Sequence, residues 1–127
     1  MSHSASVAHT RWPVEFYRSK DENPVVEELL DIRGKDLKLG TEVVQDLKDL
    51  EEFGLELPEK RLHKIKGTSL WELRTRWQHR IARSLFFEAG NRLLVVTTIF
   101  QKKTQTIPKT ALKRAEERMV RWKEEHT

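Results

Sequence analysis

The stretch Leu70-Trp-Glu-Leu-Arg-Thr-Arg-Trp77 decides the fold, because uncharged residues alternate with charged ones along it. Side chains of a β-strand point to opposite faces in turn, so a period of two predicts a strand. One face carries uncharged side chains and the other charged ones: Trp71, Leu73, Thr75 and Trp77 against Glu72, Arg74 and Arg76. A strand with one charged face is typical of an antiparallel sheet that buries its other face.

Three further strand patterns lie on either side of this stretch. Leu62-His-Lys-Ile-Lys66 precedes it across the turn residues Gly67-Thr-Ser69. Residues 80–87 and 92–100 follow it, joined by Glu88-Ala-Gly-Asn91, a typical hairpin connection. We therefore predict an antiparallel meander over residues 62–100.

Helical patterns enclose the meander. Residues 12–18 are rich in aromatic residues and predict a first strand; Asn23-Pro24 then starts a helix that Gly34 ends. A second helix reaches Gly54, and its acidic side is expected to face solvent: Glu42, Asp46, Asp49 and Glu52. Pro108 starts a last helix. The fold is expected to be α+β, with an N-terminal helical hairpin, a meander sheet and a C-terminal helix.

Length and composition bound the class of protein. The 127 residues suffice for one domain, expected over residues 12–127 after a flexible leader at 1–11. Cysteine is absent, which excludes disulfides and thiolate chemistry. No apolar run is long enough for a membrane span and no signal peptide is evident, so we expect a cytoplasmic protein. No histidine or acidic pair has metal-ligand spacing and no phosphate-cradling glycine loop is present, so we expect neither metal nor cofactor.

The charge is unevenly distributed along the chain. Residues 20–59 carry five basic and thirteen acidic residues, a net charge of −8. Residues 60–114 carry fourteen basic and two acidic residues, a net charge of +12. This asymmetry, within a formal net charge of +4, indicates a surface for a polyanion.

The basic residues of the meander are candidates for binding phosphate. Arg74 and Arg76 share the charged face, and the next strand supplies Arg80 and Arg83. Guanidinium groups bind phosphate with two hydrogen bonds and stabilise a pentacovalent phosphorane, which permits metal-free RNA cleavage by the neighbouring 2′-hydroxyl. The alternative is a solvated sheet face. Strict alternation places Arg83 with the apolar residues of its strand, and only a bulge would re-aim it.

The segment 102–109 and the first strand of the meander add further candidates. If this segment is functional, we expect it to close on the RNA backbone. The alternative is a solvated loop that leads to the last helix. Lys102 and Lys103 are candidates for catalysis, together with Arg74 and Arg83. The candidates for RNA binding, besides Arg76 and Arg80, are Lys64, Lys66, Thr104 and Lys109. Trp77 is a candidate for stacking on a base.

Proton transfer has three candidates in this region. His63 and His79 flank the basic strands, and histidine changes charge near neutral pH. Glu72 lies on the charged face with the arginines. The alternative for each histidine is an exposed residue without a catalytic role.

Several motifs resemble one family. These are Trp71-Glu-Leu-Arg74, Arg80, Arg83, Ile99-Phe-Gln-Lys-Lys-Thr-Gln105, Ile107-Pro-Lys109 and residues 111–118. They resemble HigB-like toxins of the phage-derived branch of the RelE/ParE toxin–antitoxin superfamily, over residues 13–123. The resemblance implies a RelE-like microbial RNase fold and cleavage of ribosome-bound messenger RNA. It also implies a helix-turn-helix, HigA-like antitoxin as partner, so that DNA is contacted only through that antitoxin.

The resemblance also implies roles for single residues. Arg83 falls on a catalytic arginine and Lys103 on a second, while Arg74 and Arg76 fall on a pair of lysines. A lysine in place of arginine keeps the charge but loses the two-pronged hydrogen bonding. The family tyrosine at the start of the last helix is missing, since the only tyrosine is Tyr17. The general base is therefore left to His63, His79 or Glu72.

Three functions remain open from the sequence. The first is a ribosome-dependent mRNA endonuclease, which the clustered basic residues favour. The second is a ParE-like protein that poisons DNA gyrase by binding. The third is a non-catalytic, phage-derived RNA-binding protein. The missing tyrosine favours the last two.

Overall fold

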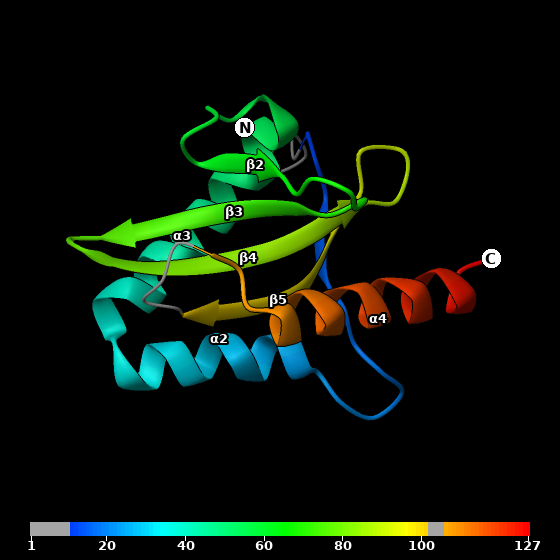
Figure 1. Cartoon of the computed structure of the whole chain (residues 1–127), viewed down its shortest axis with the longest axis horizontal. Helices are drawn as coiled ribbons and strands as arrows, with labels where there is room; N and C mark the ends of the chain where they lie inside the picture. The colour runs from blue at the N-terminus through cyan, green and yellow to red at the C-terminus, as the bar shows by residue number, and fades with distance from the viewer. Residues whose placement is uncertain (1–10, 102–105) are drawn as a thin grey trace, which may run out of the picture.

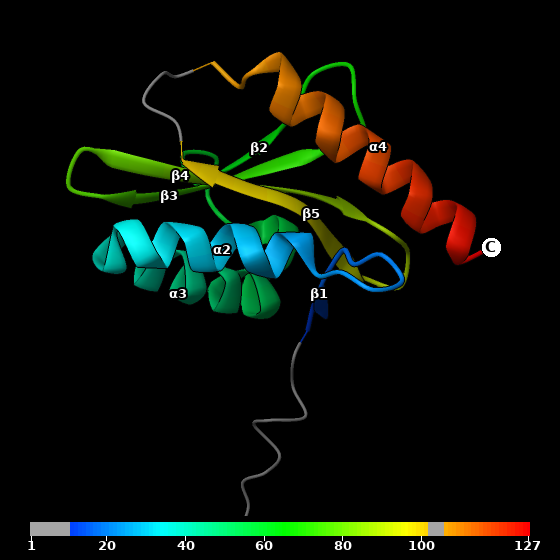
Figure 2. The same cartoon turned by 90° about the horizontal axis from the view of Figure 1, so that it is seen from below.

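A sheet of five strands lies between two helical layers in the described residues (Figure 1, Figure 2). The computed structural model describes residues 11–101 and 106–127. The strands are β1 (Val14–Phe16), β2 (Leu62–Lys64), β3 (Trp71–Trp77), β4 (Arg80–Glu88) and β5 (Leu94–Gln101). The helices are α2 (Pro24–Lys35), α3 (Leu37–Phe53), the short 3₁₀ helix η1 (Gly54–Glu56) and α4 (Lys109–Glu125).

The strand order is β1-β5-β4-β3-β2. Strands β2 to β5 are antiparallel neighbours in sequence order, which confirms the predicted meander and the α+β class. The first strand, whose partner the sequence did not specify, pairs with β5 in parallel. The sheet is therefore mixed. Parallel strands need a long crossover connection, and the chain between β1 and β5, which includes α2 and α3, provides it.

The helical hairpin covers one face of the sheet, which we call the hairpin face (Figure 2). Its apolar side is buried against the strands through Val25, Leu29 and Ile32 of α2 and Leu39, Val43, Leu47 and Leu50 of α3. The two helices cross closely at Gly40, where an added Cβ would lie 2.8 Å from the Cα of Arg33. Glycine at this point allows the backbones to approach.

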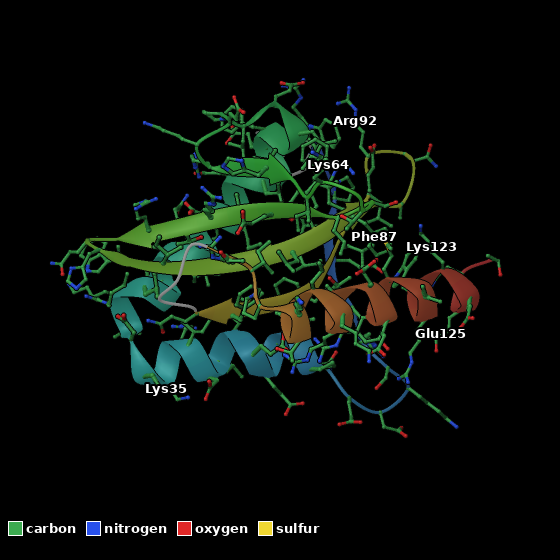
Figure 3. The ribbon with its side chains drawn as sticks, viewed as in Figure 1. Lys35, Lys64, Phe87, Arg92, Lys123 and Glu125 are labelled. Carbon is green, nitrogen blue, oxygen red and sulfur yellow. The ribbon has the colours of Figure 1, made fainter. Side chains whose placement is uncertain are left out.

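Helix α4 packs on the opposite face, which we call the α4 face (Figure 2). Trp122 meets Phe87 of β4 edge to face, with ring centroids 5.6 Å apart, and Lys123 lies over the same phenyl ring (Figure 3). Trp122 also donates its indole N–H to Glu15 of β1. Among the described residues, no helix is both long enough and apolar enough to cross a membrane.

Glu28 joins all three layers at the edge of β5. Its carboxylate accepts hydrogen bonds from the Thr98 hydroxyl at 2.9 Å and the Ile99 amide at 3.0 Å. It also accepts one from Arg118 of α4 at 2.8 Å. A carboxylate with three donors is well satisfied, so α2, β5 and α4 are held together by this one side chain.

Gly54 ends α3 in a conformation that only glycine adopts readily, with φ +55° and ψ −133°. Its Cα lies directly against the indole of Trp12, which is buried. The Trp12 amide donates to the carbonyl of Glu51, and Arg92 lies over the indole ring. The segment before β1 is therefore packed against the end of the hairpin.

Candidate nucleic-acid interface

Cross-strand pairing determines which basic side chains meet. Arg83 of β4 lies directly opposite Arg74 of β3, and side chains of paired residues share a face. Phe87, four residues after Arg83, contacts α4, so both arginines lie on the α4 face. Regular alternation therefore places the Arg83 and Arg74 side chains on the same face, and no bulge is needed to re-aim Arg83. The irregularity between β4 and β5 lies farther along, between Leu85 and Phe86.

Glu72 lies between the two arginines. Its carboxylate accepts from Arg74 Nε at 3.0 Å and from Arg83 Nη1. We call Glu72, Arg74 and Arg83 the arginine–glutamate cluster. Arg83 and Glu72 are only 1% and 2% exposed, whereas the Arg74 side chain is 30% exposed. The cluster is therefore a buried ion pair with a second arginine at its rim.

The cluster has an excess of one positive charge at its exposed side. In the described part of the chain, the two Nη groups of Arg74 have no hydrogen-bond acceptor, while Nε is held by Glu72. A guanidinium oriented in this way presents N–H groups to a ligand without losing much side-chain entropy. Arg74 is the member of the cluster that an anion could reach, and Arg83 acts on it through Glu72.

His63 adjoins this cluster. It pairs with Glu72 across β2 and β3, which places its imidazole on the α4 face beside the carboxylate. The ring is half-buried, and its Nε2 atom is buried without a hydrogen-bond partner among the residues the structure describes. His79, by contrast, is exposed in the turn between β3 and β4. The structure brings one histidine to the cluster and leaves the other at the end of the sheet.

The other candidate residues differ in the face of the sheet on which they lie and in their exposure. Arg76 is exposed and pairs with Ile81, two residues along the α4 face from Arg74. Lys64 pairs with Trp71 on the other side of β2, and its amine donates to the Thr68 carbonyl (Figure 3). Two further lysines are exposed, in the β2–β3 loop and at the first residue of α4: Lys66 and Lys109. Lys102, Lys103 and Thr104 lie outside the described residues.

Arg80 lies on the hairpin face and not in the cluster. It pairs with Trp77 across the β3–β4 turn, and its guanidinium binds the carboxylate of Asp36, with Nη2 to Oδ1 at 3.0 Å. Asp36 is the N-cap of α3 and accepts from the Leu39 amide. The Arg80 hydrogen bond holds the pKa of Asp36 below its usual value of 3.8. Arg80 thus anchors the start of α3 to the sheet.

The lowered pKa of Asp36 predicts a pH-dependent contribution to stability. The folded state favours the carboxylate, so this contribution is complete above about pH 5 and is lost as the pH falls through the folded pKa. Asp36→Asn retains a capping side chain but removes the charge. Urea unfolding midpoints should be lower for Asp36→Asn at neutral pH and should converge with the wild type in acid. Equal midpoints at neutral pH would show that the ion pair contributes nothing.

A model of a known protein family matches most of the chain. The family model described as "Phage derived protein Gp49-like (DUF891)" matches residues 31–120, from within α2 to within α4. The chain belongs to this family. Gp49-like proteins are tied to toxins of the RelE/HigB type, and the matched region contains the whole arginine–glutamate cluster. A search of curated proteins finds no match.

Sequence reasoning about this Gp49-like protein missed the pairing role of Glu72. A signal was present, because Glu72 and Glu88 are the only acidic residues between positions 60 and 114, and Glu72 shares a face with Arg74. Such an isolated acid in a basic region indicates an ion pair. No group of three or more His, Cys, Asp or Glu side chains within residues 11–101 and 106–127 is arranged to hold a metal.

The acidic side of α3 also differs from the expectation of a solvated face. Asp46 and Asp49 both accept hydrogen bonds from Arg61, at 3.0 and 2.9 Å. Burial raises the pKa of Asp46 above 3.8, although Thr75 and Arg61 lower it. Half of this acidic row therefore attaches α3 to the segment before β2 in the Gp49-like fold.

Proposed function

We propose that this Gp49-like protein is the toxin of a type II toxin–antitoxin system and cleaves ribosome-bound messenger RNA without a metal ion. The observation that carries the proposal is the partly exposed side chain of Arg74, whose guanidinium is fixed by the buried Glu72–Arg83 pair. A preorganised cation at a rim between buried and solvated regions suits a phosphate whose charge increases during reaction.

The proposed reaction is a transfer within the RNA. The 2′-oxygen forms a bond to the adjacent phosphorus, and the bond from phosphorus to the 5′-oxygen of the next nucleotide breaks. One proton leaves the 2′-hydroxyl and one reaches the departing 5′-oxygen. Arg74 and Arg76 neutralise the phosphorane oxygens in this proposal, and Arg83 positions Arg74 through Glu72.

His63 is the proton acceptor that this proposal favours among the three candidates. Both carboxylate oxygens of Glu72 already accept hydrogen bonds from arginines. His79 is exposed in the turn beyond Trp77. His63 pairs with Glu72 across the strands, so its half-buried imidazole lies beside the arginine–glutamate cluster.

Partners follow from the same proposal. The protein would contact messenger RNA and the ribosome in the cytoplasm. Lys102 and Lys103 remain candidates for catalysis in this proposal, and the candidates for contact with the RNA backbone are Lys64, Lys66, Thr104 and Lys109. The protein that neutralises it would be a helix-turn-helix antitoxin of the HigA type, which supplies the contact with DNA. The match to a family tied to RelE/HigB toxins supports this assignment.

Arg74→Ala is expected to reduce message cleavage by about a hundredfold, because it removes the charge that stabilises the phosphorane. The measurement is primer extension on a message translated in a cell-free extract with purified protein. Arg121→Ala, which removes an exposed arginine of α4, is the matched control and should cut like the wild type. Circular dichroism confirms that each variant is folded.

Other results would redirect the assignment. If Arg74→Ala cuts the message as well as the wild type does, the arginine–glutamate cluster has no part in catalysis. An uncut message together with blocked DNA supercoiling in a gyrase assay would favour the ParE-like alternative. An uncut message that is bound by the protein would favour a non-catalytic RNA-binding role.

A further inference from the structure

Strand β1 has a free backbone edge in the part of the chain that the structure describes. It ends the sheet there, and its neighbouring strand is β5. The Tyr17 amide donates to the Val96 carbonyl and the Leu94 amide to the Pro13 carbonyl, both at 2.8 Å. Alternate residues of a strand direct their backbone groups to opposite sides, so the amide and carbonyl of Phe16 point away from β5.

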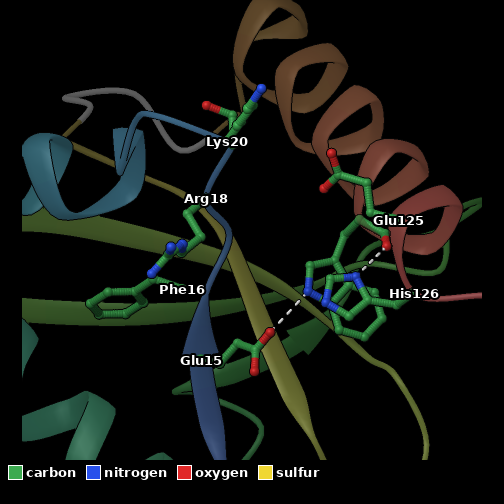
Figure 4. A pocket seen from close by; sticks show the side chains of 8 residues that line it. Glu15, Phe16, Arg18, Lys20, Glu125 and His126 are labelled. Atoms are coloured by element: carbon green, nitrogen blue, oxygen red, sulfur yellow. Dashed lines mark hydrogen bonds between the residues drawn. The ribbon is translucent and has the colours of Figure 1, made fainter.

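A hollow lies on each side of this edge. On the hairpin face, a hollow of 250 Å³ is lined mainly by apolar side chains: Val14, Phe16, Leu29, Val44 and Leu47. On the α4 face, a hollow of 460 Å³ is lined by charged and aromatic residues, including Glu15, Arg18, Lys20, Trp122, Glu125 and His126 (Figure 4). An added strand would direct its side chains alternately into the two hollows.

The polar hollow has carboxylates near its aromatic wall. Glu15 accepts the indole N–H of Trp122 at 2.9 Å, and His126 stacks on that indole with centroids 3.8 Å apart. Figure 4 shows the guanidinium of Arg18 directed toward Phe16, and the amine of Lys20 directed away from Glu15. Glu125 lies at the last turn of α4, where helix carbonyls add negative potential. A cationic side chain is the complementary occupant.

We propose that the free edge of β1 binds an extended segment of another protein in which apolar residues alternate with lysine or arginine. Backbone hydrogen bonds to Phe16 hold the segment, its apolar side chains enter the hollow beside Val44, and its cations enter the hollow beside Glu15 and Glu125. The carboxylates of Glu15 and Glu125 in the polar hollow favour a basic partner at this edge. The surface is separate from the arginine–glutamate cluster, so the proposal does not depend on RNA cleavage.

The edge is built to discriminate among partners. It is only three residues long, Pro13 precedes it, and Glu15 lies at its centre, and each of these features discourages indiscriminate strand pairing. A second copy paired antiparallel through β1 would set Glu15 beside its own counterpart, which like-charge repulsion disfavours. A segment with a cationic side chain opposite Glu15 is instead attracted by the Glu15 carboxylate.

The test uses a synthetic peptide of about ten residues that alternates valine with arginine and is blocked at both ends. Binding is measured by fluorescence anisotropy, and amide hydrogen exchange by NMR. The peptide should slow exchange of the Phe16 amide, which gains an acceptor, and should leave Tyr17, already bonded to Val96, unchanged. A valine–glutamate peptide and a peptide interrupted by proline should bind at least about tenfold more weakly.

Charge reversal on the protein completes the test. Glu15→Lys should weaken the valine–arginine peptide about tenfold, and Glu125→Lys should do the same without disturbing the bond to Trp122. Glu117→Lys makes the same change of charge on an exposed part of α4 and should have no effect. The proposal is overturned if exchange at Phe16 is unchanged, if the proline peptide binds equally, or if all three variants behave alike. A dimer in sedimentation that the peptide dissociates would assign the edge to a second copy instead.

Discussion

Arg83→Ala is expected to lower the free energy of unfolding by about 3 kcal/mol at neutral pH. Both members of the Arg83–Glu72 pair are almost completely buried, so the variant leaves a carboxylate in a poorly solvated site with Arg74 as its remaining partner. The loss is therefore a desolvation penalty as well as a lost attraction. Urea unfolding followed by tryptophan fluorescence measures it.

Two variants separate this effect from general loss of charge. Arg76→Ala removes an exposed arginine two residues along the same face from Arg74 and should change stability by less than about 0.5 kcal/mol. The double variant Glu72→Gln, Arg83→Met replaces the ion pair by neutral groups and should recover much of the loss. Equal unfolding midpoints for Arg83→Ala and Arg76→Ala would contradict a buried pair. Activity of Arg83→Ala should accordingly be assayed at a temperature where the variant remains folded.

Gly54→Ala is expected to cost about 4 kcal/mol, from two effects that act together. An alanine at φ +55° and ψ −133° is strained in any surroundings. Its Cβ would also lie 2.1 Å from the ring of the buried Trp12, which would have to leave its position. Chemical unfolding measures the sum, and a shift in tryptophan emission reports the displacement of the ring.

Gly67→Ala is the matched control for this prediction. Gly67 also has a positive φ, +79°, but an added Cβ would meet nothing within 4 Å. Only the backbone strain remains, so the cost should fall to about 1 kcal/mol. If both variants lose the same stability, the contact between Trp12 and the end of α3 has no energetic importance.

The sequence predicted those parts of the fold that depend on local periodicity. The alternation of β3, the glycine at the end of α3 and the proline before α4 each have a local physical cause, and each element lies within a few residues of its predicted place. The parallel pairing of β1 with β5 has no local cause. It depends on how the hairpin packs against the finished meander, which no short segment specifies.

The site was less predictable for the same reason. Alternation assigns side chains to two faces, but it does not say which helix covers each face. Arg80 and Arg83 differ by an odd number of residues, so they occupy opposite faces, and the pairing across the β3–β4 turn places Arg83 with Arg74. Arg80 meets Asp36, which is 44 residues away in the chain. Such long-range ion pairs leave no periodic signal in the sequence.

The parallel pairing of β1 also has a consequence for the order of folding. Val14 pairs with Leu94, and these positions are 94 − 14 = 80 residues apart. Closing so long a loop is entropically costly, whereas the meander and the helical hairpin form from near neighbours, so β1 should join the sheet late. During synthesis β1 has no strand to pair with until β5 has been made. A partner that recognises the edge of β1 within the sheet therefore requires a chain in which β5 has already been made.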